Sequence, residues 1–455
     1  MNLKNYLATF LVAAAMIGCT QEKKESVLVS NPILPGYFAD PSVVESNGKY
    51  YIYATIDPWG GDSLSCWVTE DFVNWEFEQL NWPTKQACTS PKSQGAKVWA
   101  PSVIQKGDKY YMYISVGSEV YAGVADSPLG PWKNVYDDNR PFLEYDETGY
   151  CHVIDAEVFI DDDGRNYLYW GSGWNWTNGR CYVAELADDM TTFITEKKEV
   201  TPTNYFEAPF MIRKGDTYYL TYSDGITIED SYKVRYATSK SPFGPFVEAD
   251  NSPILEKDPS RQVYGPGHHT LTNIQGELYI LYHKHRLPFI EGSAYRQMCI
   301  DKFTFSEEEG KINNITPTDG IEIAGLTKKA ERGTIKNITA EATSVKDQYS
   351  AAANVLDNSF QTMWVSAAGD NNSSLKLTLD KKQDVKQISI LFEYAWEKYP
   401  FTCFVSADGE NWETVCENSN ENRVGSPMNI SINKNIQYIK FDFNKEAAIW
   451  SVYVD

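Results

Sequence analysis

Three carboxylates open repeated segments of this chain, and together they could hydrolyse a glycosidic bond. Asp40, Asp155 and Glu207 each precede a short apolar strand, a turn at Gly or Asp, and a return strand rich in aromatic residues. A glycosidic bond is cut by two carboxyl groups, one that activates water and one that protonates the leaving oxygen. A third carboxylate nearby can adjust the pKa of such a pair. This chemistry requires a fold that brings the three positions together.

The segment that carries these acids occurs five times, with a period of roughly 50 to 60 residues that is typical of β-propellers. The five copies are FADPSVVESNGKYYIYATI from Phe38, VWAPSVIQKGDKYYMYISVG from Val98, VIDAEVFIDDDGRNYLYWGS from Val153, YFEAPFMIRKGDTYYLTYSDG from Tyr205 and GPGHHTLTNIQGELYILYHK from Gly265. The innermost strands of a propeller converge on its axis. We therefore expect five blades, with the three acids at equivalent places in one central funnel.

The rest of the chain also predicts an all-β protein. Two segments, ADSPLGPWKNV (125–135) and ATSKSPFGPFVEA (237–249), share an A-x-S-x-x-x-G-P-aromatic pattern that suits outer blade strands. No long stretch has a helical period. After residue 338 short alternating strands continue to the end of the chain, as in a β-sandwich. We predict a propeller over 31–325, a linker over 326–337 and a sandwich of the jelly-roll type over 338–455.

Composition limits the classes of partner. The formal net charge is −21, and such an acidic surface repels phosphate backbones, so we expect no nucleic acid partner. No Gly-rich loop follows a strand and opens a helix, so no nucleotide, flavin or redox cofactor is indicated. Aromatic residues make up 14% of the chain, and 13 of its 30 tyrosines lie in the return strands, where they suit packing.

The first residues have the pattern of an export signal. Lys4 is followed by the apolar run 7–17, which is too short to span a bilayer, and then by Gly18 and Cys19. This end of the run resembles the lipobox of bacterial lipoproteins. We expect a signal peptide over 1–19, lipid on Cys19 and a tether over 20–30. A protein of this kind would lie in the periplasm or on the outer-membrane surface and contact the membrane only through its lipid. The alternative is an ordinary secretory signal.

The remaining cysteines give no metal motif. Seven follow Cys19 in the sequence, without a CxxC or a Cys/His cluster, so zinc is not indicated. Cys403 and Cys416 flank a hairpin signal, and a disulfide between them is one alternative to two buried thiols.

Residues 38–323 resemble the catalytic domain of glycoside hydrolase family 43, a five-bladed propeller. The motifs that carry the resemblance stand in the order of the family and at blade spacing. They are Asp40-Pro41, the WAPS of 99–102, FIDDDGRNYLYWG after Asp155, Glu207-Ala208-Pro209, the GPGH of 265–268 and YRQMCIDKFTF from Tyr295.

The resemblance implies a role for each acid. Asp40 matches the general base, Glu207 the general acid and Asp155 the third carboxylate, which raises the pKa of the acid and orients it. An inverting enzyme holds its base and acid about 6.5–9.5 Å apart, so that water fits between them. Glu207 has to keep its proton near neutral pH, and burial and a nearby anion both act in that direction.

Other positions are carried over for binding. His268 matches a family histidine at the propeller centre that often lies near a cation such as Ca²⁺, with His269 as the alternative. Arg296 matches an arginine that reaches the sugar. We expect Trp99 to wall the pocket, and Trp174 and Trp176 to stack on sugar rings at its rim. The resemblance implies that no cofactor is needed for the chemistry, with a structural Ca²⁺ as an option.

Residues 338–455 resemble a discoidin-like (coagulation-factor type C) sandwich. The motifs are ATSVKDQYSAAANVLDNSFQTMWVS, FVSADGENWETV from Phe404 and IQYIKFDF from Ile436. Trp396 and Tyr399 are our candidates for a sugar platform there, and Trp364 and Trp412 match core positions.

The sequence thus predicts an inverting exo-acting glycosidase that removes a terminal pentose from arabinose- or xylose-containing plant glycans. α-L-Arabinofuranosidase is the first expectation and β-xylosidase the second, because both sugars present similar hydroxyls to a small pocket. An endo-arabinanase is the third. Two other classes remain: a surface protein that binds glycans without cutting them, and an adhesion protein that acts through residues 338–455.

Overall fold

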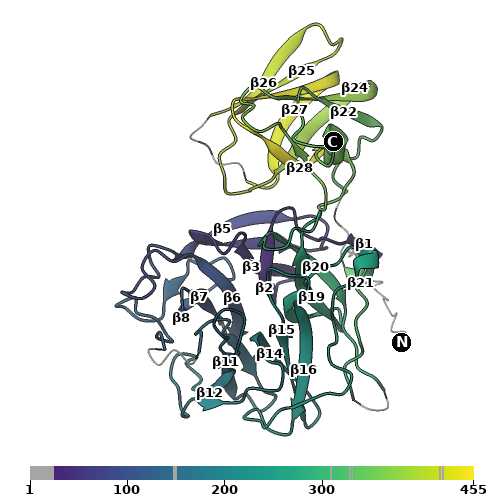
Figure 1. The fold of residues 1–455 in the computed structure, drawn as a ribbon. Helices are drawn as coiled ribbons and strands as arrows, with labels where there is room; N and C mark the ends of the chain where they lie inside the picture. The colour runs from purple at the N-terminus through teal and green to yellow at the C-terminus, as the bar shows by residue number, and fades with distance from the viewer. Residues whose placement is uncertain are drawn as a thin grey trace, which may run out of the picture.

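The computed structural model describes residues 25–146, 151–307, 310–326, 329, 331–419, 422 and 425–455. This part of the chain forms a five-bladed β-propeller followed by a β-sandwich, which confirms the predicted fold class (Figure 1). Its helical elements are two short 3-10 segments, η1 (Pro259–Arg261) and η2 (Ala352–Leu356). None of the described helices is long and apolar enough to cross a membrane. The predicted signal peptide, including Cys19, lies outside the described residues.

Each sequence repeat forms the first hairpin of one blade, and four of the blades have four antiparallel strands in chain order. These are β2 (Phe38–Ser46), β3 (Lys49–Ile56), β4 (Ser63–Thr69) and β5 (Glu76–Thr84); β6 (Val98–Lys106), β7 (Lys109–Val116), β8 (Glu119–Ala125) and β9 (Lys133–Asn134); β10 (Glu157–Ile160), β11 (Asn166–Trp170), β12 (Tyr182–Leu186) and β13 (Lys198–Glu199); β14 (Glu207–Lys214), β15 (Thr217–Asp224), β16 (Lys233–Ser239) and β17 (Val247–Glu248). The fifth sheet is β18 (Gly267–Ile274), β19 (Glu277–His285) and β20 (Arg296–Lys302). Strands β9 and β17 lie in the two segments predicted to hold outer strands.

The ring of blades closes where the two ends of the propeller meet. Strand β1 (Glu25–Ser30) pairs antiparallel with β21 (Gly320–Leu326). Asn31 then joins this pair to the fifth blade. Its side-chain amide donates to the carbonyls of Ile300 and Thr318 (2.9 and 3.0 Å), and its Oδ1 accepts from the Ile300 N–H (2.8 Å).

Every blade kinks where its first strand reaches the axis. One residue at this place has a left-handed backbone, with φ between 37° and 55°: Asp40, Ala100, Asp155, Ala208 and His268. The strand pairing shifts at this place in four blades, as at a β-bulge, which redirects a side chain. Three of the kink N–H groups donate to a hydroxyl of the preceding blade: Ala100 to Thr55, Asp155 to Ser115 and His268 to Ser223. These hydroxyls tie three pairs of neighbouring blades together at the axis.

The kink corrects one expectation from the repeats. Asp40 and Asp155 are equivalent, but Glu207 stands one residue before the kink, which in the fourth blade is Ala208. Its counterpart in the second blade is Trp99. Consecutive residues of a strand point to opposite sides, so the Glu207 side chain leaves the backbone in a different direction from those of the two aspartates.

The C-terminal unit is the predicted sandwich, built around a core of buried aliphatic and aromatic side chains. Its seven strands are β22 (Ile338–Ala342), β23 (Trp364–Val365), β24 (Ser374–Phe392), β25 (Phe401–Ser406), β26 (Trp412–Asn418), β27 (Met428–Phe443) and β28 (Ala448–Val454). The long strands β24 and β27 carry bulges that let one hydrogen-bonded sheet wrap around this core. Cys403 and Cys416 face each other across β25 and β26, and both are free thiols.

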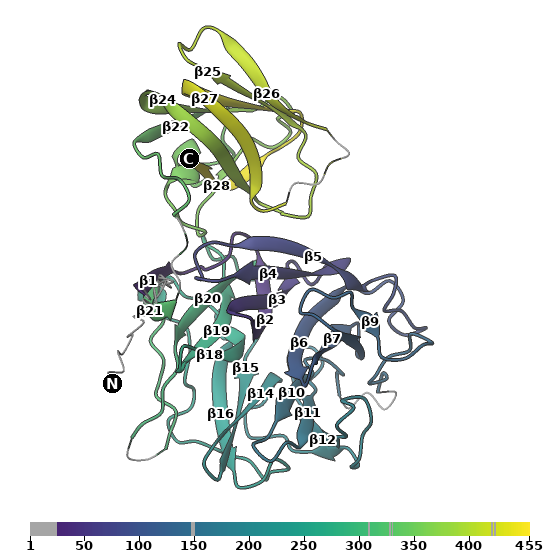
Figure 2. The same ribbon diagram turned by 180° about the vertical axis from the view of Figure 1, so that it is seen from behind.

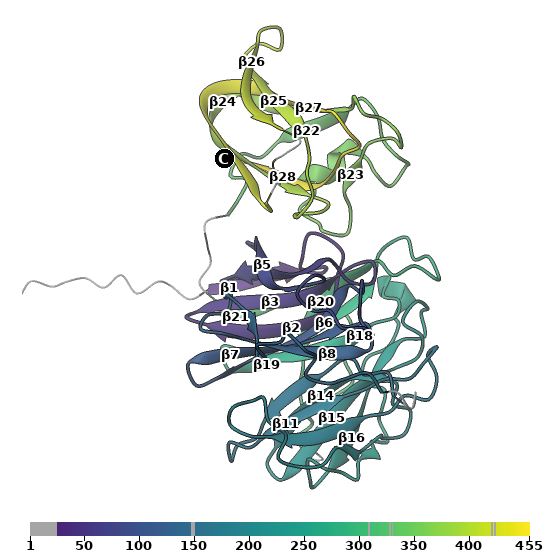
Figure 3. The ribbon, with the colours of Figure 1, turned by 90° about the vertical axis from the view of Figure 1, so that its left-hand side faces the viewer.

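Two aromatic residues of the sandwich differ from expectation. Tyr399 is buried and stacks on Phe392, so it cannot be a sugar platform. Trp396 is no platform either, because it packs on Phe38 and Phe77 of the propeller. The sandwich lies against the propeller beside β5 (Figures 2 and 3). Trp364 is fully buried as predicted, whereas Trp412 is only partly buried on the outer face of the sheet.

Candidate active site

A cavity of about 240 Å³ opens at the axis of the propeller. It is lined by seven of the predicted site residues, Asp40, Trp99, Trp174, Trp176, Glu207, His268 and Arg296. They come from all five blades or the loops between their strands, although more than 250 residues separate the first from the last. Asp155 is the eighth. It is buried beside this group, with Oδ2 3.7 Å from His268 Nδ1.

Asp40 lies among hydrogen-bond donors and positive charge. Thr55 Oγ1 donates to its Oδ2 (2.7 Å), and Arg296 Nη1 donates to its Oδ1 (2.9 Å). The Nδ1 atoms of His268 and His283 lie 3.2 and 3.3 Å from the same Oδ1. Burial alone would raise the pKa of Asp40, but Arg296 and the two imidazoles hold that pKa well below its usual range. Asp40 is therefore an anion that can accept a proton.

Arg296 is itself fixed by a second carboxylate. Asp57 is 1% exposed and accepts from Arg296 Nε (2.8 Å), Nη2 (2.7 Å) and the backbone N–H (2.9 Å). Burial raises the pKa of Asp57 to about 6, with Arg296 opposing the rise, so Asp57 is ionised at neutral pH. A two-pronged contact of this kind sets the plane of the guanidinium. Arg296 also lines the axial cavity.

Glu207 has three hydroxyl partners. Tyr232 and Thr227 donate to Oε1 (2.7 and 3.1 Å), and Ser172 donates to Oε2 (3.0 Å). Burial raises the pKa of Glu207, and the Asp40 carboxylate adds to the rise, while the hydroxyls oppose it. Asp40 and Glu207 thus have pKa values displaced in opposite directions, as a base and an acid of one reaction require.

Asp155 is the least solvated of the three acids. Both of its oxygens are buried without a hydrogen-bond partner among the described residues. Burial, with Glu207 and Asp40 as negative neighbours, raises its pKa well above the usual range. The pair Asp155 and Glu207 therefore shares its protons, and removing either group changes the titration of the other.

The geometry around His268 does not form a cation cage. Its Nδ1 faces the Asp40 and Asp155 carboxylates, and burial lowers its pKa. Among the described residues, no three His, Cys, Asp or Glu side chains are grouped to hold a metal ion. The neighbour His269 points elsewhere, to the Thr221 hydroxyl at 2.7 Å, so His268 is the histidine of the axis.

Aromatic rings form the mouth of the cavity. Trp174 is 38% exposed and stacks on His152, with ring centres 4.3 Å apart and an interplanar angle of 24°. Trp59, from the loop after β3, is 47% exposed and also lines the cavity. Trp59 and Trp176 both have a left-handed backbone (φ 61° and 56°), which is rare for bulky residues and tends to occur at functional sites.

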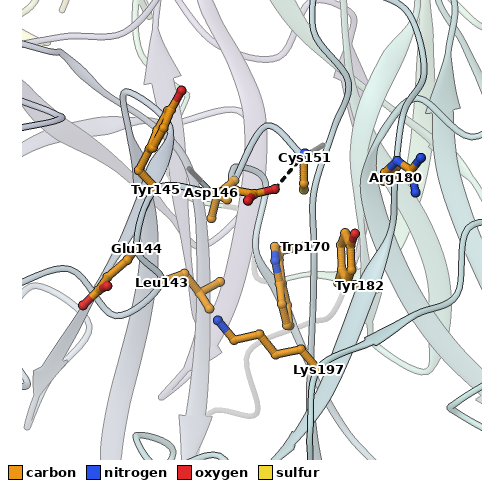
Figure 4. A pocket seen from close by; sticks show the side chains of 10 residues that line it. Leu143, Glu144, Tyr145, Asp146, Cys151, Trp170, Arg180, Tyr182 and Lys197 are labelled. Atoms are coloured by element: carbon orange, nitrogen blue, oxygen red, sulfur yellow. Dashed lines mark hydrogen bonds between the residues drawn. The ribbon is translucent and has the colours of Figure 1, made fainter. Parts of the chain in front are cut away.

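A second, larger hollow of about 590 Å³ lies on the other side of the segment 151–154 (Figure 4). Cys151 and Val153 face this hollow, whereas His152 and Ile154 face the axial cavity. Its wall includes Trp170, and none of the three predicted catalytic acids lines it. The candidate active site is therefore identified by the three acids and not by the volume of the cavity.

Several residues of the site were not predicted from the sequence. They are Asp57, Trp59, His152, Ser172, Thr227, Tyr232 and His283. Asp57 and Trp59 stand together in the DPWGG loop directly after the first repeat, which was the available signal. The others lie in return strands and loops, where a polar residue has no distinguishing pattern.

Comparisons with known proteins give the same fold and family. Residues 29–310 match the model of the glycosyl hydrolases family 43, and residues 337–454 match that of the F5/8 type C domain. The chain is similar to the β-D-galactofuranosidase xynD of Aspergillus niger, with 31% identity over 64% of this chain and 86% of that protein. It is also similar to the arabinoxylan arabinofuranohydrolase of Bacillus subtilis, with 27% identity over 69% of this chain and 68% of that protein. A solved structure titled glycoside hydrolase covers 94% of this chain and 99% of its own, with 27% identity and a TM-score of 0.79.

Proposed function

The chain belongs to glycosyl hydrolase family 43 and is a glycoside hydrolase, and on this premise we propose that it releases a terminal α-L-arabinofuranose from plant-type glycans by single displacement with inversion. The observation that carries the proposal is the axial cavity of about 240 Å³, where an ionised Asp40 and a Glu207 of raised pKa face the same space. A cavity of this size suits one sugar ring, which favours exo attack over the long groove that an endo-arabinanase needs.

In the proposed mechanism Asp40 takes a proton from water as that water attacks the anomeric carbon. Glu207 gives its proton to the leaving oxygen at the same time, so the bond breaks without a charged alcohol. Arg296 keeps Asp40 ionised and donates to a sugar hydroxyl. Trp59 and Trp174 at the mouth stack on the next sugar of the chain.

Furanose specificity is supported by two relatives, which are named for a galactofuranoside and an arabinofuranoside. The rings of α-L-arabinofuranose and β-D-galactofuranose have the same configuration, and galactofuranose differs by a longer exocyclic chain. β-Xylosidase is the second candidate, because other relatives carry the name xylosidase/arabinosidase.

The test is hydrolysis of the 4-nitrophenyl glycosides of α-L-arabinofuranose, β-D-galactofuranose and β-D-xylopyranose. We expect the arabinofuranoside to be cleaved fastest, with the α anomer inverted to β in an NMR time course. Preference for the xyloside would select the second candidate. No release from these or from arabinoxylan would overturn hydrolysis and leave a glycan-binding protein.

The catalytic assignments predict two variants with different signatures. Asp40→Asn should reduce kcat at least about 10³-fold on every substrate, because no group then activates water. Glu207→Gln should lose about as much on natural glycans but much less on 4-nitrophenyl glycosides, since nitrophenolate leaves without a proton. Unchanged thermal unfolding of both variants is the control. Equal losses on the two substrate classes would contradict Glu207 as the acid.

A further inference from the structure

The C-terminal sandwich meets the propeller at the residues next to its catalytic groups. Tyr37 and Phe38 stand directly before the strand residues that lead to Asp40, and Tyr295 and Gln297 flank Arg296. All four belong to the contact between the two units. The same two short segments thus carry catalytic groups toward the axis and contacts toward the sandwich.

Aromatic packing forms the first part of this contact. Tyr37 packs edge-on against Trp450 of β28, with ring centres 5.5 Å apart, and against Tyr295 at 5.0 Å. Phe38 packs edge-on against Trp396 at 5.8 Å. Tyr37, Phe38 and Trp450 are each at most 3% exposed. Rings buried this completely at an interface hold their partners in one place.

Hydrogen bonds form the second part. Gln297 is fully buried, and its amide donates to the Phe360 carbonyl of the sandwich at 2.6 Å. The N–H of Phe77 donates to the Ser426 carbonyl at 2.8 Å. Arg332 of the linker donates to the Trp75 carbonyl at 3.2 Å. Two domains joined by a linker move freely by default unless a substantial apolar interface holds them, and these contacts form such an interface.

The contact between the two units is connected by one hydrogen bond to Asp57, whose carboxylate fixes Arg296. The Tyr37 carbonyl accepts from the Asp57 N–H at 3.1 Å. Asp57 in turn holds Arg296, and Arg296 donates to Asp40. Strand pairing adds a second connection, because Ala39 lies opposite Thr55, which also donates to Asp40.

We propose that the sandwich is a structural support of the active site, which holds segments 37–40 and 295–297 in the geometry that catalysis needs. Tyr37, Gln297 and Trp396 are then positioning residues. The proposal rests on the roles assigned above to Asp40 and Arg296. It gives this domain a task in catalysis that does not require it to bind any glycan.

The test uses the full chain with Gln297→Ala, Trp396→Ala and both together. The matched control is Trp412→Ala, a partly buried tryptophan of the same domain whose ring packs on Tyr438 of β27. We expect kcat on the arabinofuranoside to fall about tenfold in the double variant, since small misplacements of catalytic groups are costly. KM should change little, and the acid limb of the pH profile should move to higher pH as Arg296 loosens its hold on Asp40. Trp412→Ala should change none of these.

Hydrogen–deuterium exchange supplies a readout that needs no activity. Peptides that contain Asp40 and Arg296 should exchange faster in the double variant than in the wild type or the control, while other blades exchange as before. Should Trp396→Ala unfold the sandwich, Gln297→Ala alone carries the test, because it removes one side-chain contact. Unchanged kcat, pH profile and exchange would overturn the proposal. A wild type that hydrolyses none of the glycosides would overturn the proposed function. Hydrogen–deuterium exchange would still test whether the sandwich supports segments 37–40 and 295–297.

Discussion

At the residue scale, the site works by giving two carboxyl groups opposite environments. Asp40 receives a guanidinium, a hydroxyl and two imidazoles, whereas Glu207 receives neutral hydroxyls and a negative neighbour. Asp40 is buried and Glu207 is partly buried, so desolvation alone would raise the pKa of each. The position of Arg296 decides which of them is the base.

Arg296→Gln should shift the pH dependence of activity. Without the guanidinium, the pKa of Asp40 rises, and an opposite charge at this distance typically accounts for about 1–3 pKa units. Since Asp40 acts as the anion, activity is lost as the pH falls through this pKa. The acid limb of kcat/KM should therefore move up by at least about one unit.

The quantity to measure is the pH at which the acid limb falls, and not the maximal activity. Arg296 also contacts the sugar in the proposed mechanism, so its loss lowers the activity for a second reason. Arg235→Gln is the control, as Arg235 pairs with Asp224 and Glu248 in the fourth blade. A uniform loss of activity with an unmoved acid limb would show that Arg296 does not set the pKa of Asp40.

Another carboxyl with a raised pKa, the partly buried Glu157, has no part in the proposed reaction and should lower the stability of the propeller near pH 8. It lies on the first strand of the third blade and lines a hollow of the propeller away from the acids. Burial raises its pKa to about 8, and a hydrogen bond with Ser102 opposes the rise. The folded state therefore favours the protonated form. Its contribution is complete below pH 4.5 and is lost as the pH rises toward 8.

Glu157→Gln should accordingly stabilise the propeller at pH 8 by on the order of 2–3 kcal/mol and leave it almost unchanged at pH 4. Urea unfolding at the two pH values measures this difference. Equal effects at both would mean that Glu157 titrates normally in the folded protein.

At the element scale, the repeats predicted five hairpins, because apolar alternation around a Gly or Asp turn depends only on neighbouring residues. They did not predict the offset of Glu207. A kink with φ near 50° is set by how each inner strand meets the next blade, through hydroxyls such as Thr55 and Ser115. Such contacts join residues about 40 positions apart. An alignment of the repeats compares residue types and does not show where the backbone kinks.

The closure of the ring could not be predicted from the sequence either. A substitution of Asn31 measures how much this closure contributes to stability. Its side chain satisfies three backbone groups that would otherwise lie half-buried without partners. Asn31→Ala should destabilise the propeller by about 2–3 kcal/mol, because each unsatisfied group costs of the order of 1 kcal/mol or more. The exposed Asn313, which bonds to the Thr304 hydroxyl, gives Asn313→Ala as the control. Chemical denaturation with equal midpoints for the two variants would contradict this role of Asn31.

At the scale of the whole molecule, the two units could be predicted and their contact could not. Phe38 has the pattern of a core residue of its own domain, since an apolar residue in a strand shows no sign of which partner it meets. Likewise, Trp396 in a loop looks like a sugar platform until Phe38 and Phe77 are seen to cover it. Arg296 was predicted from a motif, but Asp57, its partner 239 residues away, was not.

The N-terminal segment determines whether the protein is attached to a membrane. We propose that Cys19 carries lipid, because the apolar run 7–17 ends at Gly18-Cys19 as in bacterial lipoproteins. One acyl chain gives only marginal membrane binding, whereas two or more anchor a protein stably. Wild-type protein expressed in a Gram-negative host should therefore incorporate labelled palmitate and sediment with membranes. Cys19→Ser should do neither, while it hydrolyses the same glycoside at the same rate, because the acids of the site lie in a propeller that folds without the lipid. Labelling that persists in Cys19→Ser would refute the assignment, and an unlabelled wild type would favour an ordinary secretory signal.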